Sequence, residues 1–185
     1  SAEIGLESRL PTYSGGLGVL AGDHVKAAAD AGLDFIAITL LYRQGYGRQH
    51  LDEDGIQSET YPEFEPEKFL VDTGIDMALD LDGRKLHSRI WKKTMTGVTG
   101  KSVEVLFLDT EHPDNSPEHA TLAQRLYGGD DSTRIRQEYL LGVGGIRALK
   151  ALGVWPLQGI HLNEGHCAFA ALEMLDQGWT REELK

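Results

Sequence analysis

A short polar run near the C-terminal end of the sequence holds two imidazoles, an amide and a carboxylate: His161-Leu162-Asn163-Glu164-Gly165-His166. Such a set can bind a metal, cap a helix through Asn163, or bind sugar hydroxyls. The metal interpretation is disfavoured because the order matches neither H-E-x-x-H nor H-x-x-E-H, with Gly165 between Glu164 and His166. An amide, a carboxylate and a neutral histidine suit sugar hydroxyls better, so we expect a sugar-binding segment and no metal.

A glycine-rich run near the start is the second candidate, Pro11-Thr12-Tyr13-Ser14-Gly15-Gly16-Leu17-Gly18-Val19-Leu20-Ala21-Gly22-Asp23-His24. Glycines ahead of a helix let the backbone approach a ligand, and the first free N–H groups with the helix dipole attract an anion such as phosphate. The run is neither a dinucleotide fingerprint, because Gly22 comes one residue late, nor a P-loop, because it lacks Gly-Lys-Ser/Thr. The alternative is a glycine turn needed only for packing.

Apolar spacing predicts helices and buried strands around both candidate segments. The glycine run should open a helix that ends at Gly32, followed by a strand over 35–41. A second unit should comprise a helix over 134–152, a strand over 154–162 and a helix over 167–177. Repeated helix–strand units predict an α/β fold, with a Rossmann-like parallel sheet and helices on both faces.

The middle of the chain has a different pattern, with short alternating segments separated by turn signals. We expect inserted β-hairpins there, built from Ile75–Leu81, Leu86–Lys92 and Val103–Asp109. The later helix also contains Gly142, Gly144 and Gly145, each costing up to about 1 kcal/mol in a helix interior. Close packing against a neighbouring element would compensate for that cost.

Composition limits the classes of function. The 185 residues carry 18 Lys and Arg against 29 Asp and Glu, a net charge of −11, which disfavours nucleic-acid binding. No apolar run is long enough for a membrane helix, and the start lacks a signal-peptide pattern. A single cysteine, Cys167, fits a reducing compartment, so we expect a cytoplasmic protein that does not bind membranes.

Both ends of the sequence look cut. The chain starts at Ser1 without a methionine, and Thr180-Arg181-Glu182-Glu183 is a capping-box signature with only two residues behind it. A cap stabilises little when no helix follows, because short helices are marginal. We interpret the chain as a piece of a larger protein, the alternative being a frayed natural terminus.

Several motifs together resemble the α-glucan phosphorylases (glycogen, starch and maltodextrin phosphorylases), most closely their shorter prokaryotic branch. The similarity runs in order along nearly the whole chain and is weakest near Ile75–Gly100. The motifs are Leu10–His24, Leu41–Tyr46, Leu126–Asp130, Arg134–Tyr139 and His161–His166.

The resemblance implies that residues 1–185 form part of the N-terminal domain of a two-domain GT-B fold, whose C-terminal half is absent. Such enzymes cleave terminal α-1,4 bonds of glucans with inorganic phosphate, retain configuration and release glucose 1-phosphate. They use pyridoxal 5′-phosphate, which the absent half would bind. The partners implied are an α-1,4-glucan and phosphate, with a possible homo-oligomer.

The resemblance also implies roles for single residues. Backbone N–H groups of Gly15, Gly16, Leu17 and Gly18 would face the phosphate and sugar. His166 would bind a sugar hydroxyl, with Asn163 and Glu164 shaping the same wall. Asp130 would border the cleft, whereas Arg134, Arg136 and Glu138 would hold their helix in place. No lysine lies in a matching motif, so no catalytic residue is assigned and this chain alone is expected to be inactive.

Two alternatives remain at this point. A sugar-nucleotide-dependent glycogen or starch synthase shares the GT-B plan and a Gly-Gly-Leu loop. A non-catalytic α/β module that binds glucan or phosphate would also explain a chain without catalytic cations. The segments after the glycine run favour the phosphorylase.

Overall fold

A computed structural model describes residues 1–184 and contains a four-stranded mixed sheet. The strand order is β1 (Ile36–Leu40), β6 (Ser102–Asp109), β5 (Arg84–Thr96) and β4 (Val71–Leu81). Only β1 and β6 run parallel, whereas β6–β5 and β5–β4 are antiparallel. The prediction of an α/β fold is confirmed, but the expected parallel sheet is wrong. The segments predicted as inserted hairpins are strands of the main sheet, because β6 pairs on one edge with β5 and on the other with β1.

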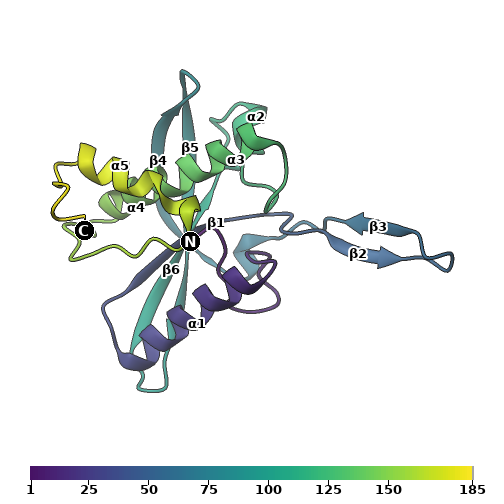
Figure 1. The fold of residues 1–185 in the computed structure, drawn as a ribbon, viewed down its shortest axis with the longest axis horizontal. Coiled ribbons are helices and arrows are strands. Elements are labelled where there is room, and N and C mark those ends of the chain that lie inside the picture. Colours follow the sequence, from purple (N-terminus) through teal and green to yellow (C-terminus); the bar gives the residue numbers. More distant parts are fainter. Residues whose placement is uncertain (185) are drawn as a thin grey trace.

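Helices cover both faces of this twisted sheet, as predicted (Figure 1). Helix α1 (Gly16–Ala31) contacts β5 and β6 on one face, and α4 (Gly145–Ala151) contacts β4 on the other. Strand β6 shows why both faces need a cover. Its Val105 and Phe107 belong to the apolar cluster under α1, whereas its Leu106 and Leu108 belong to the cluster on the opposite face.

The helix predicted over 134–152 is present but changes type along its length. It consists of α3 (Asp131–Tyr139), a π-helical segment (Leu140–Gly144) and α4. A Cβ added to Gly142 would lie 2.5 Å from the Ala170 nitrogen, and one on Gly144 would lie 2.6 Å from Met77 Cε. Close packing therefore explains these two glycines, whereas Gly145 would meet only an ordinary contact at 3.6 Å.

The predicted strand over 154–162 is wrong, because this segment is irregular. Pro156 has no N–H to give to a ladder, and Gly159 weakens a strand interior. Strand β1 is consequently an edge strand. The chain then enters η3 (Gly165–Cys167) and α5 (Phe169–Asp176), close to the helix predicted over 167–177.

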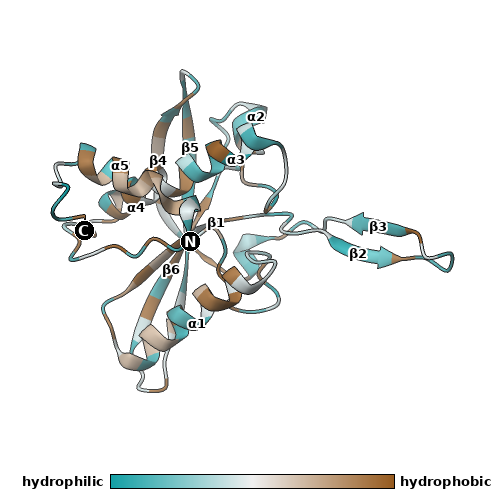
Figure 2. Ribbon diagram, viewed as in Figure 1, coloured by the Kyte–Doolittle hydropathy of each residue, from teal (hydrophilic) through white to brown (hydrophobic). Residues whose placement is uncertain are grey.

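A two-stranded arm projects from the body of the molecule (Figure 1) and was not predicted. It pairs β2 (Arg48–Leu51) with β3 (Gln57–Thr60), and all residues of both strands are exposed. Figure 2 shows that these strands are mainly hydrophilic, so they carry no alternation of apolar and polar residues that could reveal them. Two short helical turns complete the elements: η1 (Pro66–Lys68) and α2 (Pro117–Ala120).

The predicted capping box at the C-terminal end forms. The Thr180 N–H donates to Glu183 Oε2 at 2.7 Å, and the Glu183 N–H donates to Thr180 Oγ1 at 3.3 Å. Residues 181–184 form turns rather than a helix, and Lys185 lies outside the described residues. Among residues 1–184, no helix has the length and apolar character needed to cross a membrane.

Candidate functional site

The glycine run lies at the N-terminal end of α1, where its glycines fall into two groups. A Cβ on Gly18 would lie 2.3 Å from Tyr13 Cβ, and one on Gly22 would lie 2.0 Å from the Gly5 carbonyl oxygen. Packing therefore requires these two. In contrast, a Cβ on Gly15 or Gly16 would meet nothing within 4 Å. The packing interpretation thus explains Gly18 and Gly22 but leaves Gly15 and Gly16 facing open space.

A buried carboxylate, Glu3, holds this loop in place. Glu3 is 2% exposed, and its Oε2 accepts the Ser14 N–H at 2.6 Å and the Gly15 N–H at 3.3 Å. The N–H groups of the next three residues, Gly16 to Gly18, open the helix and have no acceptor within it. An anion at this helix end would therefore meet the N–H groups of residues 16–18, beyond the two that Glu3 already occupies.

Tyr127 connects Glu3 to the second candidate segment. Its hydroxyl donates a short hydrogen bond to the other carboxylate oxygen of Glu3. Burial, followed by this hydrogen bond, raises the pKa of Tyr127, so the phenol stays protonated as a donor. Tyr127 has a φ of +59°, an uncommon conformation for a residue other than glycine, in the turn before α3. The ring centroids of Tyr127 and His166 are 6.0 Å apart.

His166 has one ring nitrogen in contact with Arg134 and one without a partner. Arg134 Nη2 lies 3.4 Å from His166 Nε2. Because a guanidinium only donates, Nε2 must accept, which assigns the proton of the neutral ring to Nδ1. His166 Nδ1 is buried and has no hydrogen-bond partner among the described residues. A buried donor of this kind costs free energy until a ligand or a water satisfies it.

The other residues singled out in the sequence differ in their contacts. Asn163 Nδ2 donates to Ser1 Oγ at 2.9 Å, which joins its loop to the start of the chain. Glu164 is exposed and has a φ of +69°. Asp130 caps α3 by accepting the Thr133 N–H at 2.8 Å. Arg136, which is expected to hold its helix in place, forms ion pairs with Asp82 and Glu118.

Arg134, predicted to serve the same structural purpose as Arg136, lies instead within the candidate site. Its guanidinium carbon is 5.7 Å from the Tyr127 ring centroid, in addition to the contact with His166. Three residues apart on a helix, Arg134 and Gln137 share one face. Gln137, rather than Arg134, fixes this face to the preceding loop, because its amide donates to the Leu122 and Arg125 carbonyl oxygens.

A cavity of about 720 Å³ adjoins the site, between α1, the free edge of β1, α4 and residues 154–163. His24 of the glycine run and His161 of the polar run both line it, with ring centroids 5.2 Å apart. Its remaining lining is largely apolar, including Ile36, Ile38 and Ile146. No lysine of residues 1–184 lines the cavity, so these walls do not fit a cofactor held as a lysine Schiff base.

Known proteins are similar to this sequence over nearly its whole length. A maltodextrin phosphorylase of Thermococcus litoralis is 42% identical over 98% of the chain, and a glycogen phosphorylase of Mycobacterium tuberculosis is 42% identical over 95%. The chain is a relative of the α-glucan phosphorylases. It spans only 22% and 21% of those two phosphorylases, and 27% of a glycogen phosphorylase of Aquifex aeolicus that is 34% identical to it. No protein-family model matches the sequence.

Two members of the site, Glu3 and Tyr127, were not predicted as functional residues. Tyr127 lies in one of the motifs that carry the resemblance, Leu126–Asp130, but its spacing from other polar residues gave it no role. Glu3 shows no signal in the sequence at all. It becomes recognisable only through its burial and its bonds to residues 11, 12 and 124 positions away.

Proposed function

We propose that this chain supplies one wall of the phosphate- and sugar-binding site of an α-glucan phosphorylase of GT-B architecture. In this proposal the chain belongs to the N-terminal, Rossmann-like half, and the substrates are an α-1,4-glucan and inorganic phosphate. The similarity to maltodextrin and glycogen phosphorylases supports this assignment. No observation favours the sugar-nucleotide-dependent synthase or the non-catalytic module over it.

The observation that carries the proposal is the connection through Glu3 and Tyr127. One carboxylate holds the loop before Gly16 and, through Tyr127, the turn next to His166. This arrangement gives two unused sets of donors a fixed relationship: the first N–H groups of α1 and the buried Nδ1 of His166. The former suit an anion and the latter suits a hydroxyl oxygen, which are the two chemistries that phosphorolysis of a glucan needs.

The reaction moves a glucosyl group from one oxygen to another. An oxygen of hydrogen phosphate forms a bond to C1 of the terminal glucose, and the bond from C1 to the glycosidic oxygen breaks. The proton of the hydrogen phosphate passes to the glycosidic oxygen, which leaves as a hydroxyl of the shortened glucan. In the proposed mechanism the N–H groups of Gly16 to Gly18 bind the negatively charged phosphate near C1. The His166 Nδ1–H donates to a hydroxyl of the glucosyl unit. Donors positioned before the reaction contribute most where charge develops.

Pyridoxal 5′-phosphate would supply a phosphate group to this reaction in the complete site. The lysines of residues 1–184 do not fit it: none of them lines the cavity, and those at 68, 85, 92 and 93 form ion pairs with carboxylates. We therefore propose that residues outside this chain bind the cofactor, and we derive no step through it. The catalytic protein would work in the cytoplasm, with a homo-oligomer as a further prediction.

Titration of the ¹⁵N-labelled chain with inorganic phosphate and then with maltotetraose tests the proposal. We expect phosphate to shift the amide signals of residues 16–18, and maltotetraose to shift the ring signals of His166. With pyridoxal phosphate, phosphate and maltodextrin all present, the 185-residue chain should release no glucose 1-phosphate. Measurable turnover, or amide shifts scattered away from the glycine run, would contradict the proposed division of the site.

A further inference from the structure

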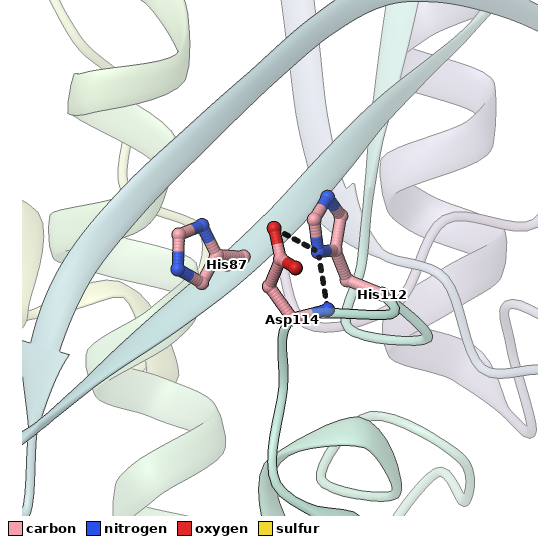
Figure 3. A group of neighbouring side chains, drawn as sticks. All are labelled: His87, His112 and Asp114. Atoms are coloured by element: carbon pink, nitrogen blue, oxygen red, sulfur yellow. Dashed lines mark hydrogen bonds and ion pairs between the residues drawn. The ribbon is translucent and has the colours of Figure 1, made fainter.

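A second cluster of polar side chains lies away from the glycine run, where β5 meets the loop after β6. It contains His87, His112 and Asp114, and one ligand atom from each lies within 4.8 Å of the others (Figure 3). His87 comes from strand β5, and the other two come from the loop after β6. The two imidazole rings stack with centroids 5.2 Å apart and an interplanar angle of 17°. Figure 3 shows the Asp114 carboxylate between the rings in this view.

The backbone that carries this cluster is held in place by Asn115. Its Oδ1 accepts the His87 N–H at 2.8 Å, and its Nδ2 donates to the His87 carbonyl oxygen at 2.8 Å and to the Thr110 carbonyl oxygen at 2.7 Å. One amide thus joins the loop of His112 and Asp114 to the strand of His87. The three side chains come from segments that are fixed relative to one another, as a preorganised site requires.

His112 is oriented as metal-binding histidines usually are. Its Nε2 lies 3.1 Å from Asp76 Oδ2 on β4, and its side chain is only 8% exposed. A carboxylate on one ring nitrogen fixes the tautomer and directs the other nitrogen at the metal. The other nitrogen, Nδ1, accepts the Asp114 N–H at 3.2 Å and lies 3.9 Å from Asp114 Oδ2. Because Nδ1 has a single lone pair, an ion bound there would take the place of the Asp114 N–H. Asp76 therefore has the position of a supporting carboxylate, and Nδ1 faces the remaining members of the cluster.

We propose that His87, His112 and Asp114 form a binding site for a divalent transition-metal ion of the zinc class, with Asp76 as a positioning residue. Two imidazoles and a carboxylate are donors that Zn²⁺ prefers, and they leave a fourth position for water. Tetrahedral coordination at about 2.1 Å needs ligand atoms about 3.4 Å apart. Rotation of the Asp114 side chain, which is 70% exposed, can bring its oxygen from 3.9 Å to that distance. The ion would join the loop after β6 to the β4–β5 hairpin.

Calorimetric titration of the metal-free 185-residue chain with Zn²⁺ tests the site, with Co²⁺ as a second probe whose visible absorption reports its ligands. We expect one Zn²⁺ per chain and a higher thermal unfolding midpoint when it is bound. Asp114→Asn should be the most informative variant, because it replaces the charged carboxylate by a neutral amide, a weaker ligand for Zn²⁺, but keeps the size of the side chain and the backbone N–H. It should weaken Zn²⁺ binding at least as much as Asp76→Asn, for which we expect about 10–100-fold.

Matched variants separate this site from general surface binding. Asp80→Asn removes a carboxylate of similar exposure, 71%, on the same hairpin, and His24→Gln removes a member of the other histidine pair. Both should bind Zn²⁺ as the unchanged chain does, with circular dichroism confirming that every variant is folded. The proposal is overturned if the unchanged chain binds no Zn²⁺, if Asp114→Asn binds it equally well, or if His24→Gln abolishes binding.

Discussion

The hydroxyl of Tyr127 donates a hydrogen bond to the carboxylate of Glu3, a residue 124 positions earlier in the chain. The same carboxylate accepts the Ser14 N–H at 2.6 Å. A single buried side chain thus joins the loop that precedes α1 to the turn that precedes α3. This contact belongs to the fold and to the candidate site at once, so its removal should change stability as well as binding.

Replacing Tyr127 with phenylalanine tests the structural part of that statement. Glu3 is 2% exposed, and without the phenol one of its oxygens loses a donor that water cannot easily replace. Loss of a hydrogen bond to a charged group predicts a decrease of about 1.5–3 kcal/mol in the free energy of unfolding. Urea denaturation followed by circular dichroism measures it.

Tyr61→Phe is the matched control, because the Tyr61 hydroxyl donates to Glu59 at 2.7 Å on the exposed arm. Both residues of that pair are accessible to water, which takes the place of the missing donor. The denaturation midpoint of Tyr61→Phe should stay close to that of the unchanged chain. Equal losses in the two variants would show that the bond between Tyr127 and Glu3 has no special structural role.

The two groups of glycines in the glycine run predict opposite responses to alanine. Gly22→Ala should destabilise the chain by about 1–3 kcal/mol or more, because its Cβ would lie 2.0 Å from a backbone oxygen. The Cβ added by Gly16→Ala would meet nothing within 4 Å, so this variant should keep the thermal midpoint. It should weaken phosphate binding, because the Cβ would occupy space through which the phosphate approaches the backbone. A large fall in the midpoint of Gly16→Ala would restore the packing interpretation for that residue.

The sequence predicted elements whose burial follows from local pattern. The run 35–41 is apolar on both faces, and it forms β1 between the two core clusters. The segment at 103–109 was placed as a strand for similar reasons, but its partners could not be predicted. Pairing of β6 with β1 on one side and β5 on the other depends on contacts between distant residues, and local alternation does not specify them.

The two binding segments of the candidate site could be predicted from the sequence, whereas the residues that connect them could not. Glycines before a helix and a polar run before another helix indicated the two binding segments. The residues that connect them act through contacts that no spacing rule encodes, since Glu3 is far in sequence from Tyr127 and Arg134 reaches His166 across 32 positions. The polar run also lacked its expected strand, because Pro156 and Gly159 oppose regular pairing there.

His166→Ala tests the proposed contact with a sugar hydroxyl. In a phosphorylase that carries this chain as a segment, loss of the Nδ1 donor should lower kcat/KM for phosphorolysis by the equivalent of about 1–3 kcal/mol. His50→Ala, on the arm, removes a histidine whose ring bonds to Thr60 and should leave kcat/KM unchanged. Unchanged kinetics for His166→Ala would count against the sugar contact.

The contribution of the Asp130 cap of α3 to stability should depend on pH. Hydrogen bonds from the Thr133 backbone N–H and from its hydroxyl lower the pKa of Asp130. A carboxyl with a lowered pKa in the folded state stabilises fully above its ordinary pKa of about 4, and this contribution disappears as the pH falls through the lowered value. Asp130→Asn keeps a good N-cap but cannot titrate. Its thermal midpoint should therefore match that of the unchanged chain near neutral pH and fall less steeply below about pH 4. Parallel midpoint profiles down to acid pH would show that the Asp130 carboxylate contributes nothing to stability.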